Sequence, residues 1–253
     1  MSLTQVRGRM QELGFQGMLP AVEGVIDQIQ RGELHLTEGL DQLLEREWRY
    51  RQQRAIATRK ARSKIRRGAS LDDFDLTLQR GLSKADLRSL ASLEWCSQGK
   101  PVIVIGPTGV GKSYLARALG LLACEAGKTS LFISVTDFLE NLAIARSSNG
   151  YLRFREKLVR TDLLILDDLG LRKFNSQEAE DLRDVVEHRS YGKSTLITTQ
   201  LPVDHWSEVI GDEIILDALV DRLASPGFTI NLQGESYRQK LHKKEVAKKG
   251  TQE

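Results

Sequence analysis

The chain has 253 residues, of which 40% are hydrophobic and 28% charged, so it is long enough for one large globular domain or two smaller ones. No stretch approaches the ~20 apolar residues needed to cross a bilayer, and the first residues lack the charged-then-apolar design of a secretory signal, which excludes a membrane protein and favours a cytoplasmic one. The two cysteines, Cys96 and Cys124, have no metal-ligand spacing, so we expect buried thiols in a reducing compartment.

Residues 1–67 are predicted to form a small all-helical N-terminal domain. Apolar residues recur at helical spacing from Leu3, again from Met18, and a third time after Thr37. The apolar stripe of the third helix consists of Leu40, Leu43, Leu44 and Trp48. Because Trp48 falls on this stripe, we expect it in the core of the domain rather than stacked on a nucleic acid base.

Positive charge is concentrated between Arg46 and Arg67. Ten basic residues oppose one acid there, so this segment has a charge of +9. Since the net charge of the whole chain is +3, the rest of the chain carries −6. Each base that neutralises a phosphate releases counterions, so we expect salt-dependent binding of duplex DNA with little sequence preference, oligomerisation on it, and association with the nucleoid. The alternative is a solvated helix face or a docking site for an acidic protein. The side chains expected to contact DNA are Arg49, Arg54, Arg59, Lys60, Arg62, Lys64, Arg66 and Arg67.

From about Leu71 the pattern changes to alternating strands and helices. The predicted strands are Val102–Ile105, Ser130–Ser134, Leu163–Leu166, Thr195–Thr199 and Phe228–Asn231. The predicted helices between them are Ser113–Ala126, Thr136–Ala145, Leu152–Val159 and Ser176–Ser190. Short apolar strands separated by helices imply an α/β fold whose parallel sheet is covered by helices on both faces. We expect this domain to span residues 68–240 and residues 241–253 to form a basic polar tail.

The segment after the first strand fits the phosphate-binding pattern GxxxxGKS at every fixed position. Glycines allow backbone amides to turn onto phosphate oxygens, with a helix N-terminus behind them. Lys112 is expected to reach the β- and γ-phosphates of ATP, and the Ser113 hydroxyl to hold Mg²⁺. The residues expected to contact the nucleotide are Gly106, Pro107, Thr108, Gly109, Val110, Gly111, Lys112, Ser113 and Tyr114.

Two acids follow the strand Leu163–Leu166. In a P-loop fold the strand neighbouring the phosphate loop delivers an acid to the Mg²⁺ shell, and we assign this role to Asp167. Asp168 is placed to polarise the attacking water. The next strand ends in Thr199 and Gln200, which can sense the γ-phosphate or can simply mark an ordinary strand exit.

Two arginines near the end of the α/β domain are further candidates for phosphate contacts. Arg222 follows a helical stretch, and Arg238 closes the domain. Each is placed to act within one subunit or across a subunit interface, although most arginines are solvated or pair with acids.

An ordered set of motifs runs through residues 70–240. In chain order, its segments are Leu71–Asp75, Gly106–Ser113, Leu163–Gly170, Thr198–Pro202, Asp221–Leu223 and Gly234–Arg238. Together they resemble the IstB-like ATPases, transposition helpers close to the DnaC helicase loaders within the AAA+ class. The resemblance implies a P-loop AAA+ core that binds ATP and Mg²⁺.

The resemblance also implies roles for individual residues. Phe74 corresponds to the position that packs against the adenine base. Asp168 stands where AAA+ proteins more often have Glu, so slow ATP hydrolysis is expected. Gln200 occupies the sensor position, with Thr199 as a rival, and Arg222 is similar to the finger arginine that acts on a neighbour's nucleotide.

Our leading hypothesis is an ATP-dependent helper of a transposase that forms ATP-bridged homo-oligomers on duplex DNA and is reset by hydrolysis. One alternative is a helicase loader with the same ATPase core. Another is an adaptor that binds ATP without hydrolysing it and whose basic segment binds protein. A small-molecule kinase is excluded, because the sequence shows no acceptor pocket or separate lid segment.

Overall fold

The computed structural model describes residues 2–65, 68–74, 81–234 and 236. The chain divides into two compact units, Met1–Thr58 and Arg59–Glu253. Their boundary lies inside helix α3 (Leu36–Arg62) and not at the predicted 67–68 junction, because the last turn of α3 packs with the second unit. The proposed tail and three predicted site residues, Arg66, Arg67 and Arg238, lie outside the described residues. None of the described helices is both long and apolar enough to span a bilayer.

The first unit consists of α1 (Leu3–Glu12), α2 (Val22–Gln30) and most of α3. The side chain of Ser2 accepts a hydrogen bond from the Gln5 amide and so caps the N-terminus of α1. The buried apolar side chains of this unit are Met18, Val22, Val25 and Leu43. This core is small, as is usual for a domain of this length.

The predicted core position of Trp48 is wrong. Trp48 is 59% exposed, and Leu40 and Leu44 from the same stripe are also more than half exposed. The buried face of α3 instead passes through Gly39, Leu43 and Glu47, which are spaced four residues apart. The helix is thus rotated by about one residue from the orientation that its most apolar stripe predicts.

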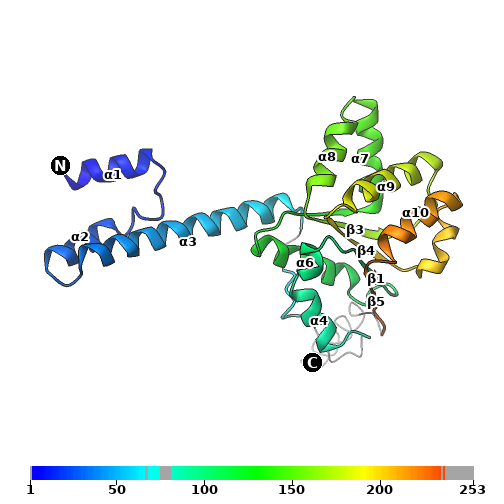
Figure 1. Ribbon diagram of the computed structural model, residues 1–253, viewed down its shortest axis with the longest axis horizontal. Helices are drawn as coiled ribbons and strands as arrows, with labels where there is room; N and C mark the ends of the chain where they lie inside the picture. Colours follow the sequence, from blue (N-terminus) through cyan, green and yellow to red (C-terminus); the bar gives the residue numbers. More distant parts are fainter. Residues whose placement is uncertain (1, 66–67, 75–80, 235, 237–253) are drawn as a thin grey trace, which may run out of the picture. The chain divides into compact units, whose positions relative to one another are not determined.

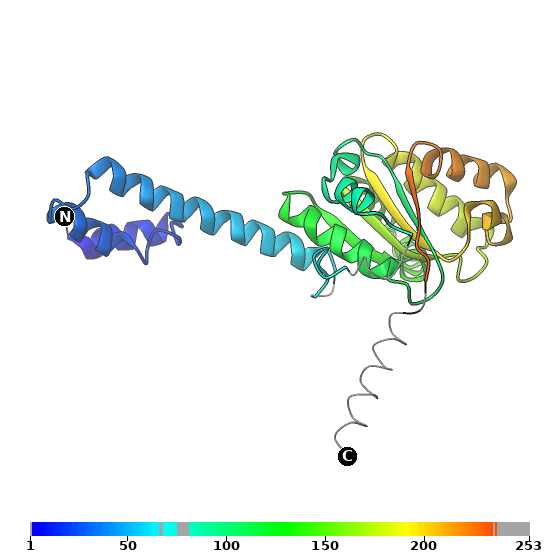
Figure 2. The ribbon, with the colours of Figure 1, turned by 90° about the horizontal axis from the view of Figure 1, so that it is seen from below.

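The second unit is built on a five-stranded parallel sheet (Figures 1 and 2). Its strands are β1 (Val102–Ile105), β2 (Ser130–Ser134), β3 (Leu163–Leu169), β4 (Ser194–Thr199) and β5 (Phe228–Asn231). Their order in the sheet is β2-β3-β4-β1-β5. The α/β fold and the five strands are therefore confirmed, with β3 longer than predicted.

Helices cover both faces of this sheet, because successive strand residues point to opposite sides. Ile103 of β1 and Leu164 of β3 pack on one face, whereas Val102 and Leu163 pack on the other. The first face is covered by α7 (Val135–Ser147), α8 (Tyr151–Arg160), α9 (Ser176–Arg189), η2 (Val203–Glu208) and α10 (Glu213–Leu223). The second face is covered by α4 (Lys84–Ala91), α5 (Glu94–Ser97) and α6 (Lys112–Glu125). Of the helices on the two faces, α4, α5 and η2 were not predicted.

Candidate nucleotide-binding site

The phosphate-binding loop connects the carboxyl end of β1 to α6. Gly109 and Gly111 have positive φ angles of 86° and 105°, and Gly111 is the N-cap of α6. Lys112 opens the helix, is only 5% exposed, and donates from Nζ to the carbonyl of Pro107 at 3.0 Å. Ser113 lies on the same first turn of α6. The loop therefore presents a helix N-terminus, a lysine and a hydroxyl group together, as phosphate binding requires.

The segment after β5 lies against this loop. The Leu232 amide donates to the Ile105 carbonyl at 2.7 Å. A Cβ atom at Gly109 would come within 2.2 Å of the Ser236 hydroxyl oxygen, so this close approach depends on glycine. Ser236 belongs to the Gly234–Arg238 motif. The described part of that motif is thus at the phosphate-binding loop.

The two acids lie at the carboxyl end of β3, where the register with β4 is irregular. We had expected β3 to lie beside β1, but β4 lies between them. Asp167 is 5% exposed and accepts a hydrogen bond from the Thr198 hydroxyl at 2.6 Å. Asp168 has a left-handed backbone with a φ of 62°.

The end of β4 distinguishes the two sensor candidates. Thr199 is fully buried, and its hydroxyl donates to the Leu169 carbonyl at 2.9 Å and accepts from the Leu201 amide at 3.0 Å. Gln200 is exposed, and its Oε1 accepts from the Thr108 hydroxyl at 2.9 Å. Gln200 therefore reaches the phosphate-binding loop, whereas Thr199 holds the backbone.

Thr198, which sequence reasoning missed, is the residue of β4 that contacts both acids. Its hydroxyl also accepts from the Asp168 amide at 2.9 Å. Nothing in the sequence singled out Thr198, because Ser194, Thr195 and Thr199 of the same strand also carry hydroxyl groups and threonine is common in strands.

Phe74, predicted to pack against adenine, and Tyr114, predicted to contact the nucleotide, come together beside α6. Phe74 is 5% exposed, and its ring centroid lies 6.3 Å from that of Tyr114 with an interplanar angle of 28°. The Tyr114 hydroxyl in turn donates to the Ser70 carbonyl at 3.2 Å. Two distant segments therefore form one aromatic surface next to the first turn of α6.

Arg222 is not at the phosphate-binding loop of its own chain. It lies in the last turn of α10, where Nη2 is 2.6 Å from Oε2 of Glu187. A Cβ atom at Gly227 would come within 2.9 Å of the carbonyls of both Leu223 and Pro101, so this end of α10 lies near the amino end of β1. The loop follows the carboxyl end of β1. Arg222 and the loop are therefore at opposite ends of the sheet.

The predicted DNA-binding side chains fall into two groups. Arg59 donates from Nε to the Cys124 carbonyl at 2.9 Å, and Lys60 lies 2.5 Å from Glu125. Both cations thus bind the C-terminal end of α6, where the helix dipole favours positive charge. The side chains that are exposed are Arg49, Arg54, Arg62 and Lys64. Arg49 among them pairs with Glu45 one turn earlier.

The chemistry of the site fits a magnesium ion bound together with a nucleotide. No group of three or more His, Cys, Asp or Glu side chains among the described residues is arranged to hold a metal by itself. Magnesium usually binds through one or two protein oxygens and the phosphates of a substrate. The Ser113 hydroxyl and the Asp167 carboxylate are oxygen donors of this kind.

Comparison with known proteins identifies relatives over almost the whole chain. The family model described as IstB-like ATP binding protein matches residues 8–245. A protein of Sinorhizobium fredii named as the insertion sequence ATP-binding protein y4pL is 39% identical over 236 residues, which cover 93% of this chain and 96% of the relative. The protein of Pseudomonas aeruginosa named as the ATP-binding protein of insertion sequence IS21 is 33% identical over 94% of this chain and 88% of its own length.

Solved structures are similar in fold. The DnaC helicase loader has a TM-score of 0.54 at 19% identity, covering 65% of this chain and 97% of the loader. The replication initiator DnaA bound to AMPPCP and single-stranded DNA has a TM-score of 0.59 at 18% identity, covering 73% of this chain and 56% of DnaA. The sheet and its flanking helices are thus similar in fold to those of DnaC and DnaA.

Proposed function

The chain belongs to the family of IstB-like ATP-binding proteins, and from this premise we propose that it is an ATPase that assists a transposase by assembling on duplex DNA. The observation that supports this proposal most directly is the separation of Lys112 and Arg222 at opposite ends of one sheet. When subunits stack head to tail, such a separation brings the arginine of one subunit to the nucleotide of the next. ATP would then bridge the subunits.

Within one subunit, each described site residue has a part in this proposal. The backbone amides at the start of α6 and Lys112 bind the phosphates, and Ser113 and Asp167 hold Mg²⁺, which neutralises charge between the β- and γ-phosphates. Asp168 orients the attacking water and Gln200 contacts the γ-phosphate. Because Asp is one methylene shorter than Glu, we expect slow hydrolysis that increases upon assembly.

The exposed arginines of α3 support the DNA part of the proposal. Phosphate contacts of this kind carry no base-specific information, so the protein should bind many duplex sequences. Binding should weaken steeply as salt increases, since each contact releases counterions. The transposase partner is inferred from the relatives, which are named as ATP-binding proteins of insertion sequences.

The test is binding of the full chain to duplex DNA with ADP, ATP or a non-hydrolysable ATP analogue, with light scattering on the same samples to measure assembly size. We expect large assemblies with the analogue, smaller ones with ADP, and none with Lys112→Ala. Binding that ignores the nucleotide, without growth of assemblies, would refute the proposal.

Two further measurements separate this proposal from its alternatives. An ATPase rate that stays at background with and without DNA would identify a non-hydrolysing adaptor. Capture of a replicative helicase rather than the transposase encoded by the same insertion sequence would identify a helicase loader.

A further inference from the structure

The strands β3 and β4 depart from regular pairing where the two acids lie. Their register shifts between Leu166 and Leu169. Within this irregularity Asp168 adopts a φ of 62°, a left-handed conformation that residues other than glycine rarely adopt. Such bulges re-aim side chains and are frequent next to active sites. The directions of the Asp167 and Asp168 side chains therefore depend on whatever holds the bulge in place.

The Thr198 hydroxyl holds it through two hydrogen bonds. It donates to Oδ1 of Asp167 at 2.6 Å and accepts from the backbone amide of Asp168 at 2.9 Å. Thr198 is fully buried, so water does not compete for these bonds. Since a hydroxyl has a single proton, its donor capacity is used entirely by Asp167. Oδ2 of Asp167 makes no hydrogen bond within the described part of the chain.

We propose that Thr198 is a positioning residue of the ATPase site. By binding Oδ1, it fixes the rotation of the Asp167 carboxylate and leaves Oδ2 to face Mg²⁺. By accepting from the Asp168 amide, it stabilises the left-handed backbone that directs this acid. Thr198 acts through the two aspartates and contacts neither nucleotide nor metal. The inference rests on the proposed function and adds one specific residue to it.

Substitution of Thr198 by valine and by serine distinguishes the effect of its hydroxyl group from the effect of its side-chain shape. Thr198→Val keeps the volume and the β-branched form but loses both hydrogen bonds, whereas Thr198→Ser keeps the hydroxyl. The matched control is Ser130→Ala. Ser130 is 5% exposed, donates to the Gly120 carbonyl at 2.9 Å, and starts β2 at the end of the sheet opposite Asp167.

The first readout is the Mg²⁺ dependence of binding of a fluorescent, non-hydrolysable ATP analogue to the full chain. We expect Thr198→Val to need about 10–100-fold more Mg²⁺ for half-maximal enhancement of binding, as is usual when a residue supporting a metal ligand is lost. Binding without Mg²⁺ should be unchanged. Thr198→Ser and Ser130→Ala should behave like the wild type. The second readout, the hydrolysis rate, should fall in parallel for Thr198→Val alone.

A Mg²⁺ midpoint for Thr198→Val equal to that of the wild type would overturn the inference, and so would an equal shift in Ser130→Ala. If Thr198→Val does not fold, as judged by circular dichroism, the comparison of Thr198→Ala with Thr198→Ser decides the same question. Absence of hydrolysis in the wild type would refute the ATPase proposal. The Mg²⁺ midpoints would still decide whether Thr198 orients Asp167.

Discussion

Glu47 is the one acid between Arg46 and Arg67, and it is buried. Its Oε2 accepts from the Gly17 amide at 2.7 Å, and its Oε1 accepts from Nε of Arg51 at 2.7 Å. Burial raises the pKa of the carboxyl group, but the hydrogen bonds outweigh burial and hold the pKa below its ordinary value of 4.5. Glu47 therefore ties the turn before α2 to α3 in its charged form.

The pH dependence follows from this direction of the shift. Because the folded-state pKa is depressed, the stabilisation is present above the unfolded pKa near 4.5 and is lost as the pH falls through the folded value. We expect Glu47→Gln to lower the stability of the first unit by about 1–3 kcal/mol at neutral pH. The amide has one acceptor oxygen where the carboxylate has two, so the charge and one of the two hydrogen bonds are lost. In acid, where the wild-type carboxyl group is protonated, the variant and the wild type should differ little.

Hydrogen exchange of the amides of α2 and α3 would measure this loss locally. Glu45→Gln is the matched control, because Glu45 lies on the same helix in an exposed pair with Arg49 and should contribute little. Equal protection in Glu47→Gln and the wild type at neutral pH would contradict the prediction.

At single residues, the sequence predicts motif chemistry better than supporting contacts. Lys112, Ser113 and Asp167 could be proposed from the sequence because phosphate and magnesium binding restrict residue type and spacing. Thr198 could not, because its role depends on a bulge in the neighbouring strand. The same holds for Glu47, whose burial depends on how α3 is rotated.

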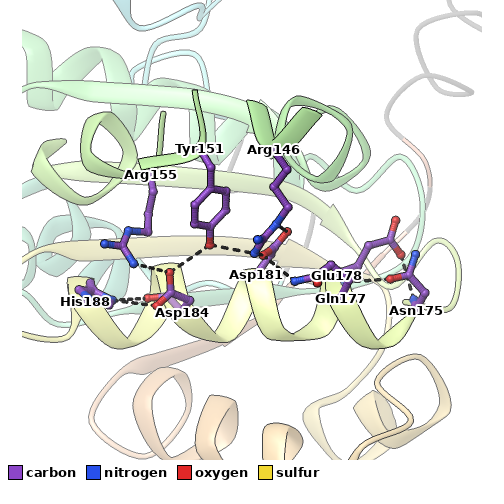
Figure 3. Close-up of polar contacts among 9 residues, drawn as sticks. All are labelled: Arg146, Tyr151, Arg155, Asn175, Gln177, Glu178, Asp181, Asp184 and His188. Carbon is purple, nitrogen blue, oxygen red and sulfur yellow. Dashed lines mark hydrogen bonds and ion pairs between the residues drawn. The ribbon is translucent and has the colours of Figure 1, made fainter. Parts of the chain in front are cut away.

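Helix α9 is fastened to the hairpin of α7 and α8 by a polar network (Figure 3). The Tyr151 hydroxyl lies 3.1 Å from Oδ2 of Asp184, and Arg146 pairs with Asp181. The Arg146 guanidinium carbon also lies 3.9 Å from the centroid of the Tyr151 ring. Burial and the two carboxylates raise the pKa of Tyr151 to about 12, so its hydroxyl keeps its proton and donates over the whole physiological range.

Tyr151→Phe removes this donor and leaves the ring beneath Arg146. We expect the free energy of unfolding of the second unit to fall by about 1 kcal/mol, the usual net value of one hydrogen bond. Urea unfolding followed by circular dichroism would measure it. Tyr191→Phe is the control, because Tyr191 is 83% exposed. A loss of the same size in both variants would show that the network contributes nothing.

Whole strands were predictable to within a few residues. The bounds of β1, β2 and β5 agree with the prediction, although only Ile230 of β5 is buried. For β1 and β2 the reason is that short apolar runs between turns have few alternatives in a parallel sheet. α4 was missed although Ser83 and Asp86 form a capping box that marks its start. The face of α3 was assigned wrongly, because the partner of an amphipathic helix is set by the tertiary fold.

At the scale of the molecule, the position of Arg222 opposite the phosphate-binding loop predicts that neither Arg222→Ala nor Lys112→Ala will hydrolyse ATP alone. Each variant retains the residue that is substituted in the other. In an equimolar mixture, Lys112→Ala subunits should supply Arg222 to the nucleotide of Arg222→Ala subunits and restore part of the rate. The loss from Arg222→Ala should be roughly 10³-fold where the finger operates.

ATPase assays on the separate variants and on the mixture measure this effect. Arg183→Ala, an exposed arginine on α9, should hydrolyse ATP like the wild type. If the mixture is no more active than its separate components, Arg222 does not act on the nucleotide of the neighbouring subunit.

The position of β4 between β1 and β3 has a consequence for mutational drift. Gln200 at its end contacts Thr108, while Thr198 two residues earlier contacts Asp167. Substitutions in contacting pairs combine non-additively, so each pair should show strong epistasis in a double-mutant cycle. A lineage that exchanges the glutamine is then expected to adjust position 108, and one that exchanges Thr198 to adjust the acids. The carboxyl end of β4 and the residue that follows it thus link the evolutionary paths of two otherwise distant motifs.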